Sequence, residues 1–376
     1  MCSSDLVKIL KKPVTSTFIA IICGFIVASV VLCIAGYNPI EAFNALFKGI
    51  LSKPKYISNT IIKATPIILT GVSVAFAFKT GLFNIGAEGQ YIAGTIAATI
   101  VGIKLNLPAI IQIPVVILAG MLAGAIFGGI VGLLKAKFGI HEVITSIMLN
   151  WIGLYLSNFV VGSETFHQPD STSTYMINES GFTTIFGNYK TTEEGIKFFS
   201  QHKWLSDIMI KTDVNIGIIV AVIMAIVIWV LLYKSSKGYA LRAVGSNRDA
   251  AEFAGINVDK NIIQAMVIAG ALCGLAGALA ITGTSPHKLS TMAAFENNGF
   301  NGLSVALIAG SSPIGCIFAG LLFGGLLYGG QSVQSAIGAP SEIINIMIGT
   351  IVFFVALTKM VPVLADRLLK RGEKKC

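Results

Sequence analysis

The stretch AIIQIPVVILAGMLAGAIFGGIVGLL, residues 109–134, contains 26 residues and no charged side chain. A helix of that length spans about 39 Å, which is enough to cross the roughly 30 Å hydrocarbon core of a bilayer. Its apolar residues form one continuous run, whereas a strand of a membrane β-barrel alternates apolar and polar residues over about ten residues. The whole chain is 54% hydrophobic and 12% charged, while soluble domains carry about 25% charged residues. We therefore predict an all-α, polytopic membrane protein.

Similar apolar runs recur along the chain. Because a crossing helix needs about 20 apolar residues, the shortest run, 300–311, cannot cross alone. The first run follows Lys8, Lys11 and Lys12 and is too long for the apolar part of a signal peptide, so we expect it to be retained. We predict about ten transmembrane helices, at 14–36, 57–78, 82–103, 109–134, 143–162, 214–233, 261–283, 300–311, 314–332 and 342–361.

Lysine and arginine predict the orientation of these spans. With the N-terminus inside, 17 of the 27 basic residues fall on the cytoplasmic side, as the positive-inside rule requires. Both termini are then cytoplasmic, loop 163–213 is extracytoplasmic and loop 234–260 is cytoplasmic. We treat 1–376 as a single transmembrane domain. Residues 38–56 have the spacing of an amphipathic helix at the outer interface. We interpret loop 163–213 as a docking surface or a cap.

Two spans carry glycines at helical four-residue spacing. Gly120, Gly124 and Gly128 lie on one face of the fourth span, and Gly320 and Gly324 repeat the pattern in the ninth. Such ridges let two helices approach closely. A shift of five spans places the third span on the eighth and the fourth on the ninth. The matched spans cross the membrane in opposite directions. We therefore predict an inverted repeat of spans 2–5 and 7–10, although glycine-rich membrane helices are common without any repeat.

The third span is interrupted by GLFNIGAEGQ, residues 81–90. Glu88 lies nine residues beyond Lys79, about 13 Å if helical, and so falls near the bilayer midplane. A carboxylate at that depth is costly and indicates function. Two interpretations remain open: Glu88 lines a transport path, or it braces the interrupted helix. A proton relay is less favoured because we find no second deep acid or histidine.

Other polar and aromatic residues could line a path with Glu88. Asparagine beside an aromatic ring suits a ligand with a ring and hydroxyls, such as a sugar or a nucleoside; core packing explains the same residues. Our candidate substrate-pathway residues are Phe83, Asn84, Glu88, Gln90, Asn150, Trp151 and Asn301.

The long cytoplasmic loop has its own pattern. Residues 240–245 and 249–255 predict two short helices, with Ser246 or Asn247 as an N-cap before Arg248. A rigid helix pair between two spans indicates mechanical contact with a cytoplasmic partner, and we expect its residues to be exposed. The candidate coupling residues are Gly238, Leu241, Arg242, Gly245, Asn247, Ala250, Ala251 and Gly255.

Three motifs in order resemble one family. Loop 234–260 resembles the coupling loop of binding-protein-dependent ABC importer permeases, the branch that includes ribose, branched-chain amino acid and nucleoside systems. GLFNIGAEGQ is similar to the signature of the nucleoside and simple-sugar permeases, and GLSVALIAGSSPIG (302–315) to a late motif of the same family. The resemblance implies a multi-pass permease in a bacterial plasma membrane that imports purine nucleosides or a simple sugar by alternating access.

The resemblance also implies partners: a cytoplasmic ATPase, a second permease that is a different chain, and an extracytoplasmic substrate-binding lipoprotein. The chain lacks G-x-x-x-x-G-K-[ST], so we expect no enzyme activity, no metal or cofactor, and ATP use by the partner. The +9 net charge favours contact with anionic membrane lipid. No nucleic acid is expected, because no compact basic domain exists. The alternatives are an ion-coupled secondary transporter with Glu88 as coupling carboxylate, and a membrane enzyme, for which the sequence offers no cluster of His, Cys or acids.

Overall fold

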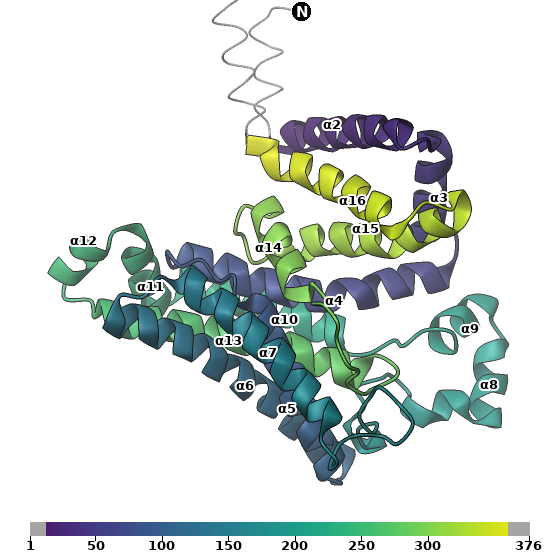
Figure 1. Ribbon diagram of the computed structural model, residues 1–376, viewed down its shortest axis with the longest axis horizontal. Helices are drawn as coiled ribbons and strands as arrows, with labels where there is room; N and C mark the ends of the chain where they lie inside the picture. Colours follow the sequence, from purple (N-terminus) through teal and green to yellow (C-terminus); the bar gives the residue numbers. More distant parts are fainter. Residues whose placement is uncertain (1–12, 360–376) are drawn as a thin grey trace, which may run out of the picture. The chain divides into compact units, whose positions relative to one another are not determined.

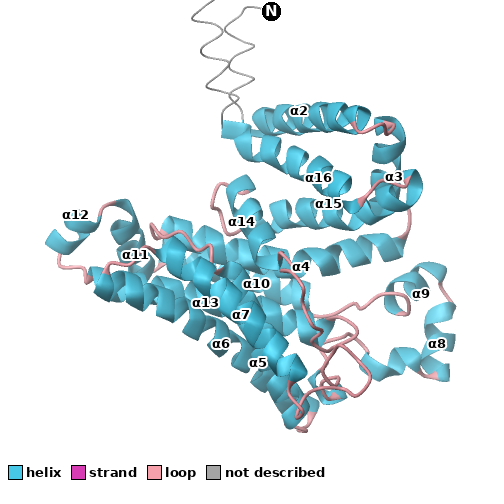
Figure 2. Ribbon diagram, viewed as in Figure 1, coloured by secondary structure: helices cyan, strands magenta, loops and turns pink. Residues whose placement is uncertain are grey.

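The computed structural model describes residues 13–359, and Figure 2 shows that they are mainly helical. Both predicted cytoplasmic tails lie outside the described residues, as do positions 360–361 of the tenth predicted span. The helices in chain order are α2 (Pro13–Ile34), α3 (Pro39–Leu51), α4 (Pro54–Lys79), α5 (Ala87–Lys104), α6 (Ala109–Phe138), α7 (Glu142–Gly162), η1 (Glu179–Gly181), η2 (Gly187–Thr191), α8 (Glu193–Ser200), α9 (Lys203–Met209), α10 (Gly217–Lys234), α11 (Ser236–Ser246), α12 (Arg248–Phe253), α13 (Val258–Gly283), α14 (Asn298–Ile308), α15 (Gly315–Ile337), α16 (Ser341–Ala356) and η3 (Leu357–Lys359).

Six of these helices, α4, α6, α7, α10, α13 and α15, are long and apolar enough to cross a membrane. The prediction of an all-α polytopic membrane protein is confirmed. The first nine predicted spans each overlap one helix, and the tenth overlaps α16 and η3. The third differs at its start: residues 82–86 are not helical, and α5 begins at Ala87. The glycines and amides of this segment explain the difference, because they favour turns over a continuous helix.

The chain divides into two compact units, residues 53–324 and the described residues on either side of them. In the larger unit α13 is central, and α4, α5 and α6 all pack against it, as Figure 1 shows. Helix α14 packs against α4, α7 against α5, and α10 against α4. Most of α13 and α4 is therefore buried by protein, while much of α6 and α10 presents apolar side chains outward.

The contact between α6 and α13 is made by glycines on both helices. A Cβ atom on Gly124 would lie 2.7 Å from Gly274 Cα, and one on Gly274 would lie 3.1 Å from Gly124 Cα. Gly120 and Gly128 meet the same face of α13 one turn away on either side. Backbones that approach this closely leave no room for any side chain.

The smaller unit comprises α2, α3, the later part of α15, α16 and η3. Helix α16 packs along α2, and the Phe25 ring lies 5.0 Å from the Phe43 ring and 5.9 Å from the Phe47 ring. Helix α3 begins at the Asn38 N-cap and ends before the predicted position 56, because Pro54 starts a new helix. Its location at the outer interface stays a prediction.

Loop 163–213, which joins α7 to α10, is folded against the end of α5 and the segment that follows α13. The Thr174 and Ile177 amides donate to the carbonyls of Leu289 and His287, at 2.8 and 3.1 Å. The Asn178 amide donates to the Gly102 carbonyl at the end of α5, at 2.9 Å. The loop therefore covers the same end of α5 and α13, which is the geometry of a cap.

Candidate functional site

The interrupted segment before α5 closes on itself through two amide side chains. The Asn84 side chain donates to Gln90 Oε1 at 2.8 Å, and the Gln90 side chain donates to Asn84 Oδ1 at 3.0 Å. Both residues are buried. Each amide thus satisfies the other, which is how polar groups are tolerated inside a membrane protein.

The same amide pair is tied to two long helices through Ser73 of α4. Asn84 Nδ2 lies 3.4 Å from Ser73 Oγ, and the Ser73 hydroxyl donates to the Ala269 carbonyl of α13 at 2.7 Å. Cys273 Sγ lies 3.1 Å from the same hydroxyl. The turn is therefore anchored to α4 and α13 by a continuous set of hydrogen bonds.

Asn150 of α7 binds the segment on both sides of the start of α5. Its side-chain oxygen accepts from the Gly89 amide at 2.8 Å, and its side-chain nitrogen donates to the Ile85 carbonyl at 3.1 Å. The Gly89 amide is among the N–H groups that a helix start leaves without intrahelical partners, and the Ile85 carbonyl belongs to the turn before α5. The buried Asn150 side chain supplies the missing partners.

Glu88 lies at the N-terminus of α14. Its Oε1 accepts from the Asn297 amide at 2.9 Å, and its Oε2 accepts from the Gly299 and Phe300 amides at 2.5 and 3.3 Å. Asn297 gives α14 no side-chain cap of its own. The carboxylate therefore caps a helix 209–212 residues away in sequence, at the helix end where negative charge is favourable.

Three residues that we did not select surround this carboxylate. The Asn298 side chain donates to Tyr91 Oη and to Glu296 Oε2, each at 3.0 Å, and Tyr91 Oη lies 3.4 Å from Glu296 Oε2. Tyr91 and Asn298 are buried, whereas Glu296 is exposed. Their signal in the sequence was the polar run 296–298 before a short span, together with a tyrosine directly after Gln90.

Trp151 lies in an aromatic cluster. Its ring packs edge-on against Phe295 with centroids 4.8 Å apart and stacks on Tyr155 at 6.0 Å. Phe295 in turn contacts Phe300, the residue whose amide binds Glu88. Trp151 is 45% exposed. Asn301 follows Phe300 and is half-buried.

Phe83 is not part of this group. Its ring stacks on Phe78 of α4 with centroids 5.2 Å apart. Its amide donates to Glu142 at 3.4 Å, and Glu142 is paired with Lys135. The candidate pathway residues that surround the start of α5 are Asn84, Glu88, Gln90 and Asn150. Trp151 and Asn301 are their neighbours. Phe83 lies apart from them, near Lys135 at the end of α6.

The two predicted helices of loop 234–260 are present as α11 and α12. The Asn247 side chain accepts from the Ala250 amide at 3.0 Å, so Asn247 is the N-cap of α12. Leu241 and Ala251 are buried and hold the pair against the rest of the unit, and Gly238 fits against the backbone of α10. Gly255 ends the second helix with a φ of +77°. Phe253 at the end of α12 is 96% exposed.

Gly245 and Arg242 are less exposed than we expected. A Cβ atom on Gly81 would lie 2.5 Å from Gly245 Cα, and one on Gly245 would lie 2.5 Å from the Thr80 carbonyl carbon. Gly81 also has a φ of +74°. Glycine is therefore required there for two reasons, the left-handed backbone and the lack of space for a Cβ atom. Arg242 is half-buried, with its guanidinium 5.1 Å from the centre of the Tyr233 ring. Helix α11 thus rests directly on the turn that begins GLFNIGAEGQ.

The chain is 38% identical to the guanosine ABC transporter permease protein NupP of Bacillus subtilis (strain 168), over 94% of this chain and 96% of that protein. It is 34% identical to the nucleoside ABC transporter permease protein NupB of Lactococcus lactis subsp. cremoris (strain MG1363), over 96% and 98%. It is 28% identical to the glucose ABC transporter permease protein TsgB13 of Haloferax volcanii, over 89% and 85%. No solved structure matches.

These relatives are named as transport permeases and not as enzymes. With its apolar helices, the chain is a multi-pass protein of the bacterial plasma membrane. The family described as "Branched-chain amino acid transport system / permease component" matches residues 56–356. The chain therefore belongs to this family of ABC transporter permeases.

Proposed function

We propose that this chain is the permease subunit of an ATP-driven importer for purine nucleosides or a related simple sugar. The observation that carries the proposal is the nearly end-to-end 38% identity to a guanosine ABC transporter permease. A cytoplasmic ATPase supplies the energy, a substrate-binding lipoprotein delivers the substrate, and a second, different permease completes the membrane path. No cofactor binds this chain, and ATP is used by its partner.

The charge at the α14 N-terminus supports an uncharged substrate. Transporters with interrupted helices often direct a helix N-terminus at the anionic group of their substrate. Here the Glu88 carboxylate already occupies that position and accepts three amide hydrogen bonds. An amino acid would bring a second carboxylate to a site that has its own. A nucleoside or a simple sugar brings none.

The exposed groups beside Glu88 are suited to such a substrate. Aromatic faces stack on planar bases and sugar rings, and a carboxylate accepts hydrogen bonds from hydroxyls. Trp151 and Glu296 are exposed, and Phe295 is half-buried between them. By contrast, Asn84 and Gln90 are bonded to each other and buried. In our proposal the substrate passes Trp151, Phe295 and Glu296, and Glu88 braces the wall behind them.

The packing of the larger unit supports the inverted repeat of spans 2–5 and 7–10. Under that repeat α4 corresponds to α13, α5 to α14, and α6 to α15. Helices α5 and α6 pack on α13, as Gly124 illustrates. Reciprocally, α14 packs on α4, and a Cβ atom on Gly324 of α15 would lie 2.8 Å from Ala64 Cα of α4. The Gly320 face of α15 meets Ile68 of α4 in the same way.

The contact of Gly245 with Gly81 gives the importer a mechanical route. Movement of α11 by an ATPase would act first on the turn at Gly81. That turn is joined to α7 by Asn150 and to α14 by Glu88. The helices around the substrate path would therefore move with the cytoplasmic loop, as alternating access requires. Bistable packed elements of this kind transmit small displacements over long distances.

Replacing Phe253 with aspartate is expected to uncouple the importer. The side chain is 96% exposed at the end of α12, so the substitution removes a contact available to a partner without disturbing the fold. Substrate-stimulated ATP hydrolysis of the reconstituted complex should fall at least tenfold, with an unchanged unfolding temperature. Phe253→Leu is the matched control and should keep most of the activity. Wild-type hydrolysis by Phe253→Asp would show that α12 does not contact the motor.

Reconstitution tests the proposed function directly. The chain is placed in proteoliposomes alone or with its ATPase and second permease, and uptake of labelled guanosine, glucose and leucine is measured with the binding protein present. We expect ATP-dependent uptake of guanosine or glucose by the complex, no leucine uptake, and neither hydrolysis nor uptake by the chain alone. Uptake by the lone chain that follows a proton gradient and disappears in Glu88→Gln would instead establish the ion-coupled transporter.

A further inference from the structure

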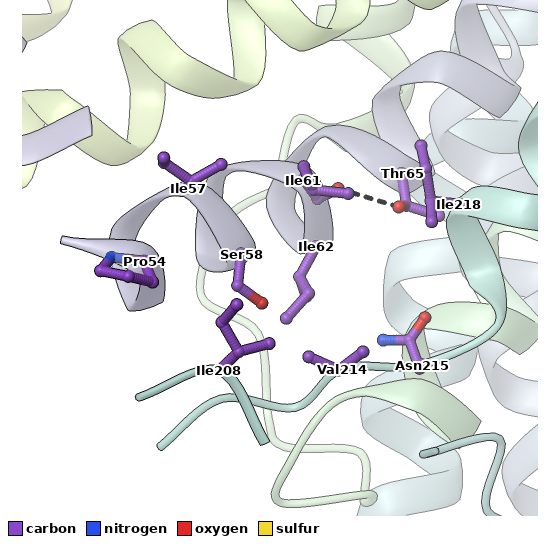
Figure 3. A pocket seen from close by; sticks show the side chains of 10 residues that line it. All are labelled: Pro54, Ile57, Ser58, Ile61, Ile62, Thr65, Ile208, Val214, Asn215 and Ile218. Atoms are coloured by element: carbon purple, nitrogen blue, oxygen red, sulfur yellow. Dashed lines mark hydrogen bonds between the residues drawn. The ribbon is translucent and has the colours of Figure 1, made fainter. Parts of the chain in front are cut away.

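The larger unit contains an apolar cavity of about 330 Å³ between the start of α4, the end of α9 and the start of α10. Its volume falls in the range of about 300–1,000 Å³ that small-ligand sites occupy. Figure 3 shows isoleucine side chains from three segments directed into it. The residues that line it are Pro54, Ile57, Ser58, Ile61, Ile62, Thr65, Ile208, Val214, Asn215 and Ile218.

The few polar groups in the wall already have partners within the protein. The Thr65 hydroxyl donates to the Ile61 carbonyl at 2.9 Å, and Ser58 bonds Thr212 at 2.9 Å. The Asn215 side chain donates to the Gly283 carbonyl and accepts from the Gly217 amide. The wall therefore offers a ligand almost no free hydrogen-bonding group, and the chemistry that fits it is a hydrocarbon chain.

Lysines gather beside this cavity. Lys53 and Lys55 flank Pro54, and both ammonium groups lie within 6 Å of the Tyr56 ring. Lys211, three residues before the lining residue Val214, pairs with Asp207 at 2.7 Å. The hydrogen bond from Lys211, with the nearby charges of Lys55 and Lys203, lowers the pKa of the Asp207 carboxyl. A second carboxylate, Asp213, directly precedes Val214 and lies 3.9 Å from Lys190. Lys53, Lys55, Lys190, Lys203 and Lys211 thus face two carboxylates, Asp207 and Asp213, which leaves an excess of positive charge.

The α8–α9 segment that carries part of this wall has features of a membrane-surface element. Phe198 is 53% exposed and Trp204 is 57% exposed, and both belong to short helices that also carry lysines. Tryptophan and other aromatic side chains with neighbouring lysines are typical of the boundary between lipid headgroups and hydrocarbon. The cavity therefore lies where a lipid headgroup and its chains are available together.

We propose that this cavity holds one acyl chain of an anionic phospholipid, whose headgroup phosphate is bound by Lys53, Lys55 and Lys203. The isoleucine wall selects the hydrocarbon, and the excess positive charge selects the anionic headgroup. The site is independent of the substrate path, because its lining residues share none of the side chains around Glu88 and Trp151.

The experiment measures lipid binding by native mass spectrometry of the full chain released from nanodiscs. The probes are dioleoyl phosphatidylglycerol, dioleoyl phosphatidylcholine with the same chains and a neutral headgroup, and glycerol phosphate without chains. We expect phosphatidylglycerol to bind at least tenfold more tightly than phosphatidylcholine, and glycerol phosphate not to compete. A phosphatidylglycerol with a diazirine in its acyl chain should cross-link to residues 54–65 or 208–218.

Matched variants separate the two parts of the site. The triple variant Lys53→Gln, Lys55→Gln, Lys203→Gln should reduce the preference for phosphatidylglycerol to less than threefold, whereas Lys197→Gln on α8 should leave it unchanged. Ile218→Phe fills the cavity and should weaken phosphatidylglycerol binding at least tenfold. Ile219→Phe, the exposed neighbour on α10, is its control. Ile57→Trp at the cavity mouth repeats the test if Ile218→Phe fails to fold.

Several outcomes would overturn the proposal. Equal binding of the two phospholipids would remove the role of the lysines, and equal effects of Ile218→Phe and Ile219→Phe would remove the role of the cavity. Competition by glycerol phosphate would show a free-phosphate site instead. Cross-links confined to other helices would show ordinary annular lipid.

Discussion

Replacing Glu88 with alanine should greatly reduce both the amount of folded protein and the transport that remains. The substitution removes the acceptor of the buried Gly299 amide and of the part-buried amides of Asn297 and Phe300. A buried unpaired donor costs about 1–3 kcal/mol, so the Gly299 amide alone is expected to lower the free energy of unfolding by that amount, and the two part-buried amides add to it. The measurements are the unfolding temperature of the solubilised chain and the uptake rate per folded molecule in proteoliposomes.

Two further variants distinguish a brace from a path-lining residue. Glu88→Gln retains one side-chain oxygen as acceptor and should fall between wild type and Glu88→Ala in stability. Glu296→Ala removes an exposed carboxylate of the proposed path, so it should lower transport several-fold with little change in unfolding temperature. If Glu88→Ala folds like wild type and only transport is lost, Glu88 lines the path and the brace interpretation is wrong.

The second large effect concerns the glycine contact of α6 and α13. In Gly274→Ala the new Cβ would lie 3.0 Å from the Gly120 carbonyl carbon and 3.1 Å from Gly124 Cα, so two backbones must separate. Overpacking of this kind costs about 1–3 kcal/mol, and more where only backbone can yield. We expect a clearly lower unfolding temperature and poor accumulation in the membrane.

Gly129→Ala on α6 is the matched control for this prediction. A Cβ atom there would meet only Val267 Cγ2, at 3.2 Å, which is the end of a side chain. Alanine also favours helix by about 1 kcal/mol over glycine. Gly129→Ala should therefore be as stable as wild type. Equal unfolding temperatures for the two variants would show that the close approach of α6 and α13 does not contribute to stability.

The sequence was most informative where the physical signal is local. The run of apolar residues at 109–134 predicted a helix that the structure has at Ala109–Phe138. Asn247, three residues before Ala250, predicted a cap whose hydrogen bond is present. In each case the pattern and its consequence lie within a few turns of one helix, so no knowledge of the fold was needed.

Long-range partners could not be predicted in the same way. Four-residue spacing identified the face of α6 that carries Gly124, but not α13 as the helix that meets it. Depth identified Glu88 as unusual, yet its acceptor role depends on amides more than 200 residues away. Gly245 looked like an exposed loop residue because nothing in loop 234–260 indicates that α11 rests on Gly81. Periodicity identifies the face of a helix that packs against another helix. Tertiary packing decides which helix that is.

The cap that Glu88 provides for α14 also has a consequence for biosynthesis. Gly299 is made 211 residues after Glu88, which at about 5–20 residues per second is a delay of roughly 10–40 s. During that interval the nascent chain carries an acidic side chain at the start of α5 with no helix to receive it. The membrane-insertion machinery or a chaperone must protect the incomplete helix bundle during this interval. Stalling of the ribosome before codon 299 should therefore expose the nascent chain to quality-control proteases.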